Sequence, residues 1–277
     1  MITSSASGCD IAIHQLGGTG PPLVICHATG FNALTYEPLA RTLASTFEVW
    51  ALDFRGHGKS AAPIDGNFGW EAMATDLLAC IDAIGTSSIY AVGHSMGGTA
   101  ILLAARQRPG CIITTYLYEP IIFPAKHLFG CQESPLADQA RRRREVFESR
   151  EAAFKRYSSK PPLNILRTDV LAAYVKTGFE ELGDGTIRLA CRTESEALTF
   201  ETTEKLTIEE LDTFTLSLTV GVGLMANSPS PKDFAPLIVD RITGACLIEY
   251  EHLGHFGPLQ APDQIAADAT KVLQAEL

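Results

Sequence analysis

Short apolar runs alternate with helical patterns over residues 1–120 of the chain. Residues 23–27 (Leu-Val-Ile-Cys-His) form one such run, which is typical of a strand buried on both faces of a parallel sheet. In residues 70–84 apolar side chains recur every three or four positions, which predicts an amphipathic helix that ends before Gly85. This alternation predicts βαβ units, and therefore an α/β fold with a mostly parallel central sheet and helices on both faces. Strands are predicted at 23–27, 48–54, 88–93 and 112–118, and helices at 36–44, 70–84 and 99–108.

The pattern changes between residues 124 and 212, where no clean run for a buried strand occurs. This stretch is predicted to be helical, with a break at Pro161 and Pro162. The alternation returns with strands at 214–222 and 246–250 and a final amphipathic helix at 263–277. We therefore expect a single domain over residues 1–277, with a core formed by 1–123 and 213–277 and a helical cap inserted at about 124–212. The insertion follows a strand, at the edge where open α/β sheets bind ligands.

Composition and charge argue against several classes of protein. The chain has 277 residues, of which 46% are hydrophobic and 19% charged, and this balance excludes an intrinsically disordered protein. Its formal net charge of −10 argues against binding of nucleic acid or of an anionic membrane through the overall field. No segment has the long apolar run of a membrane span, and the first residues lack the basic and apolar regions of a secretory signal, so we expect a cytoplasmic protein. The 7 scattered cysteines contain no Cys-x-x-Cys pair, which predicts reduced thiols and no zinc site.

Four consecutive arginines at 141–144 form the strongest charge run. A site for phosphate or nucleic acid is one interpretation, and a solvated helix face is the other. The second is favoured because acidic and basic residues stand four positions apart in this region, the spacing of ion pairs on a helix. The predicted pairs are Asp138–Arg142, Arg141–Glu145, Arg144–Glu148 and Glu151–Lys155.

A candidate nucleophile lies in the sequence Gly93-His94-Ser95-Met96-Gly97, between a predicted strand and a predicted helix. A tight turn of this kind needs small residues on either side of the serine, and it lifts the serine hydroxyl clear of the sheet. The free N–H groups of the following helix favour negative charge nearby. The motif therefore predicts that Ser95 is a nucleophile.

A serine nucleophile needs a base, because its hydroxyl is weakly nucleophilic at neutral pH. Of the 7 histidines, His255 follows the last predicted strand and precedes the last predicted helix. This position lies above the sheet edge from which Ser95 protrudes, so His255 is the predicted base and His252 the second choice. His57 is expected to order its own loop, and His94 to pack under the cap or to line the substrate pocket.

Four motifs together resemble the α/β-hydrolase superfamily over essentially the whole chain. The resemblance implies the α/β-hydrolase fold, with Ser95 as the nucleophile and His255 as the base. It also implies an oxyanion hole made by the backbone N–H of Met96 and that of Thr29, with Ala28 as second choice for the latter. The four motifs are His27-Ala28-Thr29-Gly30-Phe31, residues 53–60 (Asp-Phe-Arg-Gly-His-Gly-Lys-Ser), Gly93-His94-Ser95-Met96-Gly97-Gly98 and Gly254-His255-Phe256. Asp53, in the second motif, is expected to accept backbone N–H bonds and to take no part in catalysis.

The resemblance also implies an acidic residue that completes a catalytic triad with Ser95 and His255. In most members of the superfamily this acid follows the strand predicted here at 214–222, and this sequence departs from that pattern. The loop after that strand holds no carboxylate before Asp233. The strand at 112–118 is followed directly by Glu119, and some members place their acid there. Glu119 is therefore the first candidate for the acid and Asp233 the second.

These residues predict a serine hydrolase, an esterase or lactonase that works through an acyl-enzyme, without a metal or organic cofactor. Serine in the turn argues against the epoxide hydrolases and haloalkane dehalogenases, which attack an alkyl carbon through a carboxylate. Three alternatives stay open: hydrolysis of a carbon–carbon bond, a cofactor-free lyase or oxygenase reaction, and a non-catalytic small-molecule binder with a decayed triad. The expected substrate is a small apolar or aromatic molecule, and the candidates for its pocket are Phe31, Trp70, His94, Phe123, Met225 and Phe256.

Overall fold

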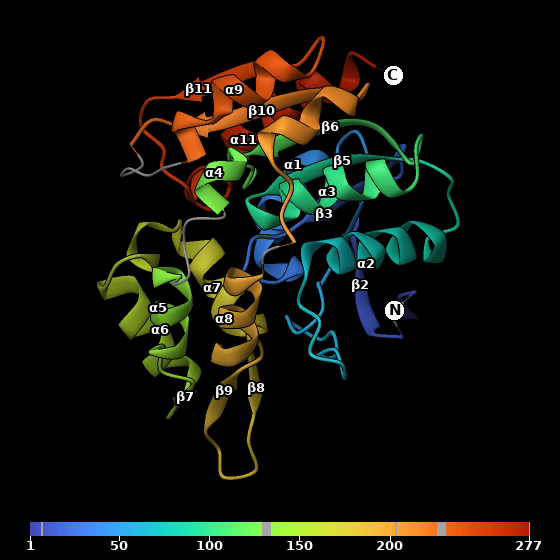
Figure 1. Cartoon of the computed structure of the whole chain (residues 1–277). Helices are drawn as coiled ribbons and strands as arrows, with labels where there is room; N and C mark the ends of the chain where they lie inside the picture. The colour runs from blue at the N-terminus through green and yellow to red at the C-terminus, as the bar shows by residue number, and fades with distance from the viewer. Residues whose placement is uncertain (7, 129–133, 203, 226–230, 277) are drawn as a thin grey trace.

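The computed structural model describes residues 1–6, 8–128, 134–202, 204–225 and 231–276. Its centre is an 8-stranded sheet in the order β1-β2-β4-β3-β5-β6-β10-β11 (Figure 1). The strands from β4 to β11 in this order pair in parallel, and β1 and β2 form an antiparallel edge. The predicted mostly parallel sheet is therefore confirmed. The strands are β1 (Ile2–Ser4), β2 (Asp10–Gly17), β3 (Pro22–Cys26), β4 (Glu48–Leu52), β5 (Ile89–His94), β6 (Ile112–Tyr118), β10 (Ser217–Gly223) and β11 (Cys246–Tyr250).

Strand β3 shows why its sequence is continuously apolar. Val24 and Cys26 belong to a hydrophobic cluster on one face of the sheet, and Leu23 and Ile25 belong to a second cluster on the other face. Because successive side chains of a strand point to opposite faces, every position of a strand covered on both sides is buried. The first cluster includes residues of α2 (Trp70–Ala83), α3 (Met96–Gln107) and α9 (Ala235–Arg241), and the second includes residues of α1 (Glu37–Leu43) and α11 (Pro262–Gln274).

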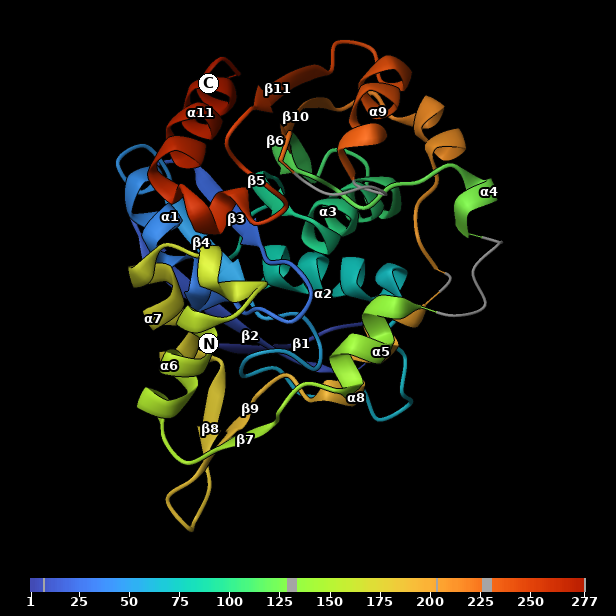
Figure 2. The ribbon, with the colours of Figure 1, turned by 90° about the vertical axis from the view of Figure 1, so that its left-hand side faces the viewer.

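Between β6 and β10 the chain leaves the main sheet, and most of this segment lies toward the lower part of Figures 1 and 2. The segment is mostly helical, and it also holds a second sheet of 3 short strands in the order β7-β9-β8 that the sequence did not indicate. Each of these strands has only 2 or 3 residues, too few to show an alternating pattern in the sequence. The elements are α4 (Ala125–Leu128), α5 (Pro135–Arg141), β7 (Val146–Phe147), α6 (Arg150–Ser159), η2 (Leu163–Ile165), α7 (Thr168–Thr177), β8 (Phe179–Glu181), β9 (Ile187–Leu189), α8 (Thr193–Glu201) and η3 (Ile208–Thr213).

The arginine run at 141–144 is not one solvated helix face, because α5 ends at Arg141. Of the predicted ion pairs, only Arg144–Glu148 forms within the described ranges, at 2.6 Å. Arg141 and Arg143 instead reach across to carboxylates of α8. The run therefore ties two helices of the insertion together, through Glu194, Glu196 and Glu201.

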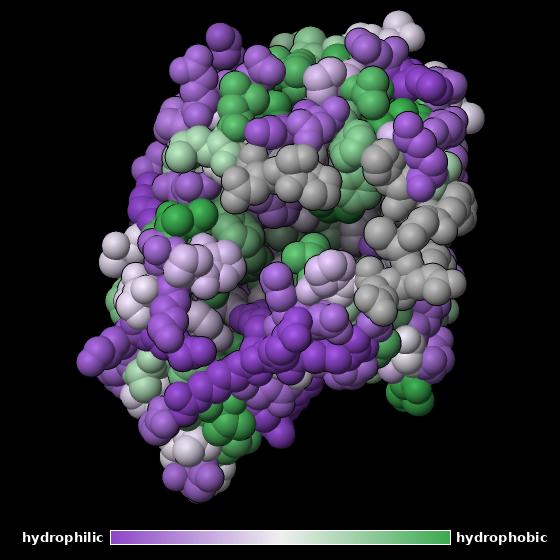
Figure 3. Space-filling view, turned by 60° about the vertical axis from the view of Figure 1, so that its left-hand side comes forward, coloured by the Kyte–Doolittle hydropathy of each residue, from purple (hydrophilic) through white to green (hydrophobic). Residues whose placement is uncertain are grey.

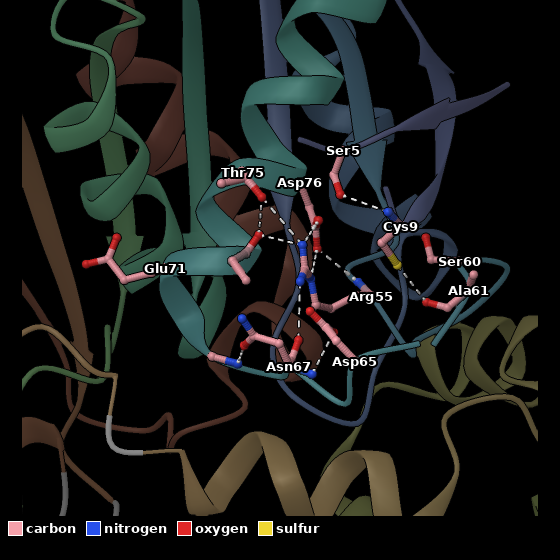
Figure 4. Close-up of polar contacts among 12 residues, drawn as sticks. Ser5, Cys9, Arg55, Ser60, Ala61, Asp65, Asn67, Glu71, Thr75 and Asp76 are labelled. Atoms are coloured by element: carbon pink, nitrogen blue, oxygen red, sulfur yellow. Dashed lines mark hydrogen bonds and ion pairs between the residues drawn. The ribbon is translucent and has the colours of Figure 1, made fainter. Parts of the chain in front are cut away.

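The loop after β4 is held in place by buried charged side chains. Asp53 accepts N–H bonds from Ala33 at 2.8 Å and Lys59 at 2.9 Å, which confirms its expected structural role. The fully buried Arg55 donates to the two carboxylate oxygens of Asp76 in α2, at 2.9 and 2.6 Å (Figure 4). Arg55 also donates to two backbone carbonyl oxygens of the same region, so the loop is fixed on α2.

Within the described ranges, no helix has the length and the apolar character needed to cross a membrane. The same ranges contain no group of 3 or more His, Cys, Asp or Glu side chains arranged to hold a metal ion. The predicted reduced thiols are confirmed for Cys9, Cys26, Cys80, Cys111, Cys191 and Cys246, and Cys131 lies outside the described residues.

Candidate active site

The turn between β5 and α3 holds Ser95 in a strained backbone conformation, with φ 55° and ψ −121°. Positive φ is unusual for a residue with a side chain, and such strain persists only where the surrounding structure enforces it. The neighbours must be small. A Cβ atom on Gly97 would collide with the carbonyl oxygen of Cys26 at the end of β3, and one on Gly93 would collide with the backbone of Gly98.

Three side chains from three strand ends form one hydrogen-bonded chain. The hydroxyl of Ser95 lies 3.1 Å from Nε2 of His255, and Nδ1 of His255 lies 2.6 Å from Oε2 of Glu119. His255 stands in the loop after β11, and Glu119 directly follows β6. The Glu119 side chain is fully buried and that of His255 is 31% exposed, so this row of hydrogen-bonded side chains extends from the core to an accessible surface.

Strand β10 holds both the side chain and the backbone of Glu119. Its Oε1 accepts the N–H of Gly223 at 2.9 Å, and its own N–H donates to the carbonyl of Gly221 at 2.9 Å. The second candidate acid, Asp233, is an exposed residue at the end of η4 (Pro231–Asp233) and makes no described contact with His255. Between these two carboxylates, the structure therefore brings Glu119 and not Asp233 to the imidazole.

The other histidines are engaged elsewhere. His252 is exposed and pairs with Gln264 at 3.2 Å, away from Ser95. His57 is buried in its own loop, where its Nδ1 lies 2.9 Å from the carbonyl of Arg55, as expected.

Two backbone amides, those of Met96 and Thr29, are the candidates for an oxyanion hole. Met96 is the first residue of α3, and the first N–H groups of a helix have no acceptor within it. The N–H of Ala28 donates to the hydroxyl of Tyr36 at 3.1 Å, whereas the Thr29 amide has no acceptor among the described residues. The side chains of Thr29 and Met96 are in contact, with Oγ1 donating to Sδ at 3.4 Å. The geometry thus favours Thr29 over Ala28 as the second donor.

A polar chain that was not anticipated from the sequence lies beneath this site. The hydroxyl of Tyr36 lies 2.7 Å from Nδ1 of His94, and Nε2 of His94 lies 2.7 Å from the carbonyl of His255. Burial holds the pKa of His94 well below its usual range, so the ring is neutral. The Tyr36 hydroxyl then donates to Nδ1, and the N–H at Nε2 donates to His255. His94 therefore supports the histidine loop from below and does not line the cavity.

A cavity of about 740 Å³ opens beside Ser95 and His255. Its apolar wall includes aromatic rings in mutual contact. The centroid of Phe31 lies 5.3 Å from that of Tyr174 and 5.6 Å from that of Phe256. Figure 3 shows this face hollowed near its centre, with hydrophobic residues beside the hollow and a hydrophilic band below it. Of the predicted pocket residues, the cavity is lined by Phe31, Trp70, Phe123, Met225 and Phe256.

A mostly parallel sheet that carries a serine on a strained turn, with a histidine and a buried carboxylate in line, is the arrangement of the α/β-hydrolase fold. The chain belongs to the alpha/beta hydrolase family, whose model matches residues 23–269.

The chain is similar to several hydrolases of known name. It is 32% identical to N-formylmaleamate deformylase of Pseudomonas putida over 126 residues, which are 45% of this chain and 47% of that protein. The match thus spans about half the length of that relative. It is 24% identical to a soluble epoxide hydrolase of Corynebacterium over 273 residues, 92% of this chain and 90% of that protein. Among solved structures, E-2-(acetamidomethylene)succinate hydrolase superposes with a TM-score of 0.82 at 17% identity, covering 99% of both chains.

Proposed function

We propose that this chain is a serine hydrolase that cleaves an ester or lactone bond through an acyl-enzyme. The observation that carries the proposal is the continuous chain Ser95–His255–Glu119, which ends at a cavity large enough for a small molecule. A serine, an imidazole and a carboxylate in this order activate the hydroxyl for attack on a carbonyl carbon.

Each group has a distinct part in the proposed reaction. The Ser95 oxygen attacks the carbonyl carbon while Nε2 of His255 accepts the hydroxyl proton. The amides of Thr29 and Met96 stabilise the oxyanion, and Glu119 keeps the imidazole oriented and stabilises its charged form. His255 then donates the proton to the leaving alcohol, and water, deprotonated by the same imidazole, releases the acid and restores Ser95.

An amide bond is the second candidate for the scissile bond. The name N-formylmaleamate deformylase denotes loss of a formyl group from nitrogen, and the name E-2-(acetamidomethylene)succinate hydrolase denotes hydrolysis of a compound with an acetamido group. The same three residues serve this reaction, with His255 protonating a leaving nitrogen. Epoxide opening is disfavoured despite the similarity to an epoxide hydrolase, because this chain has a serine and not a carboxylate in the turn.

Ser95→Ala tests the proposal directly. Turnover of para-nitrophenyl esters of increasing acyl length should fall to the residual rate set by the oxyanion hole and binding, about 10³–10⁴ above the uncatalysed rate. The matched control is Ser158→Ala, on the exposed face of α6, which should keep full activity. Intact-mass measurement in the first seconds of turnover should show the acyl group on the wild type and none on Ser95→Ala. Full activity of Ser95→Ala would refute the assignment, and ester hydrolysis without an acyl adduct would indicate direct attack of water with His255 as general base.

A further inference from the structure

The cavity beside Ser95 is lined by far more positive than negative charge. Among the described residues of its lining, Glu196 is the one carboxylate. The charge of the cavity is therefore opposite to that of the whole chain, whose formal net charge is −10. The basic residues of the lining are Arg142, Arg143, Arg144, Arg156, Lys160 and Lys205.

Two of these cations pair with carboxylates of the described residues. Arg143 pairs with Glu196, and Arg144 pairs with Glu148. Within the described ranges, the other four have no carboxylate within ion-pair distance. Arg142, Arg156 and Lys160 are exposed, so water solvates them at the mouth of the cavity.

Lys205 differs from these three because it is partly buried. Its Nζ donates to the backbone carbonyl of Phe200 at 2.8 Å and lies 5.1 Å from the ring centroid of Trp70. Burial lowers the pKa of Lys205 to about 8. An ammonium removed from water without an anionic partner is unfavourable, and this cost is offset when an anion binds beside it.

We propose that the substrate carries a carboxylate, which binds to Lys205 inside the cavity while the scissile acyl group lies at Ser95. The proposal rests on the hydrolytic function proposed above. Ser95 and Lys205 line the same cavity, and Trp70 and Phe31 provide apolar surface for the part of the substrate between them. Arg142, Arg156 and Lys160 attract the anion to the mouth, because clefts lined by one sign of charge raise the local concentration of the opposite ion.

The proposal adds a carboxylate to the small apolar or aromatic substrate expected from the sequence. The apolar wall is present, but a neutral ligand would leave Lys205 partly desolvated without an anion. Because free energy is gained only when the charge is paired, a ligand with a carboxylate at the right distance should be preferred to a neutral ligand of the same shape.

The test compares two esters that differ in one charge. The para-nitrophenyl half-ester of glutarate carries a carboxylate at the end of its acyl chain, and para-nitrophenyl pentanoate is its neutral counterpart. The quantity measured is the kcat/KM of the charged ester divided by the kcat/KM of the neutral ester. This ratio is then divided by the ratio of the rate constants with which hydroxide hydrolyses the same two esters, so that their intrinsic reactivities cancel. The wild type should have a ratio well above one. Lys205→Met should lower it by about ten- to a hundredfold, the range for loss of one hydrogen bond to a charged group.

Two further variants make the result specific. Lys205→Arg keeps the charge and should retain most of the ratio. Lys271→Met removes an exposed lysine of α11 outside the cavity and should leave both rates unchanged. A wild-type ratio of one or less, or an unchanged ratio in Lys205→Met, overturns the substrate proposal while Ser95-dependent hydrolysis stands.

Direct binding separates this proposal from the catalytic one. Calorimetric titration of the folded protein with glutarate should show binding to the wild type that weakens in Lys205→Met by the same factor. If neither ester is hydrolysed but glutarate binds in this manner, the proposed reaction fails and the anion site stands. If glutarate binds both proteins equally or neither, the anion site is refuted.

Discussion

Ser95 and Glu119 are the non-glycine residues with positive φ in the described part of the chain, at 55° and 43°. They directly follow His94 and Tyr118, which are paired in the ladder between β5 and β6. The N–H of Ser95 donates to the carbonyl of Tyr118 at 3.0 Å. Because Tyr118 directly precedes Glu119, this hydrogen bond joins the two strained turns. Backbone strain at both positions aims the two side chains at one imidazole, which a regular strand end would not do.

The first prediction at this scale concerns the acid of the triad. Glu119→Gln keeps the size of the side chain but removes the negative charge that stabilises the His255 imidazolium, so kcat should fall by up to about 10⁴, or roughly 5 kcal/mol. Asp233→Asn changes an exposed carboxylate and should keep kcat within about twofold, since surface substitutions of this kind have small effects. Both variants are assayed side by side on one ester. A large loss in Asp233→Asn without one in Glu119→Gln would move the acid to the loop after β10.

Some site residues can be read from the sequence and others cannot. Ser95 and Glu119 are tied to strand ends, and strand ends follow from apolar runs, so their proximity is predictable. Lys205 and Tyr36 carry no such signal. Lys205 lies at the end of the long insertion and Tyr36 in a short 3-10 helix, and one lysine or one tyrosine in a sequence is most often a surface or core residue.

At the scale of elements, one row of hydrogen bonds joins the loop after β3 to the loop after β11. It begins at the N–H of Ala28, passes through the hydroxyl of Tyr36 and the ring of His94, and ends at the carbonyl of His255. The first of these residues precedes Thr29, and the last is His255, the proposed base. The oxyanion loop after β3 and the histidine loop after β11 are thus held by one buried chain, so their spacing is set by η1 (Ala33–Tyr36) and β5.

Tyr36→Phe should separate this positioning role from simple packing. The change leaves the Ala28 N–H and the His94 nitrogen without partners in a buried place, so the free energy of unfolding should fall by about 1–3 kcal/mol. A small displacement of the oxyanion loop should lower kcat by up to about a hundredfold, with a smaller change in KM. Urea unfolding and steady-state kinetics measure the two effects.

The control for this experiment is Tyr90→Phe, which removes a hydroxyl bonded to the carbonyl of Glu276 far from the site. This variant should lose a similar or smaller part of its stability and keep its kcat. If Tyr36→Phe destabilises the protein but leaves kcat per folded molecule intact, the polar chain is structural only.

The elements of the core are predictable where their pattern is long enough. The strands of the parallel part of the sheet are buried on both faces, and this gives continuous apolar runs in the sequence. The insertion lacks this signal because β7, β8 and β9 cover only 2 or 3 residues each. The end of α5 at Arg141 was also missed, because the arginines that follow are good helix formers and the acids they pair with lie on α8, outside the local sequence.

At the scale of the whole molecule, ion pairs differ sharply in what they contribute. Most of the pairs are exposed, and exposed pairs give little stability because water and salt screen them. Arg108–Asp82 is one of these, with side chains 38% and 61% exposed. Arg55–Asp76 has both side chains fully buried and joins the loop after β4 to α2, and neither residue lines the cavity. The stability of the fold therefore depends on the second pair far more than on the first.

Arg55→Met tests this difference on the folded state as a whole. The change leaves the Asp76 carboxylate buried without its partner, and breaking a buried pair on one side costs about 3–5 kcal/mol. Arg108→Met, its matched control, should cost about 0–1 kcal/mol. Chemical unfolding of the three proteins gives both values. The double variant Arg55→Met with Asp76→Leu removes both charges and should recover a large part of the loss, because the penalty comes from the unpaired carboxylate and not from the missing contact. Since the pair lies outside the cavity lining, kcat per folded molecule should stay near that of the wild type in all of these variants. A loss in Arg55→Met no larger than in Arg108→Met would show that water reaches Asp76 and that the loop is not anchored by this pair.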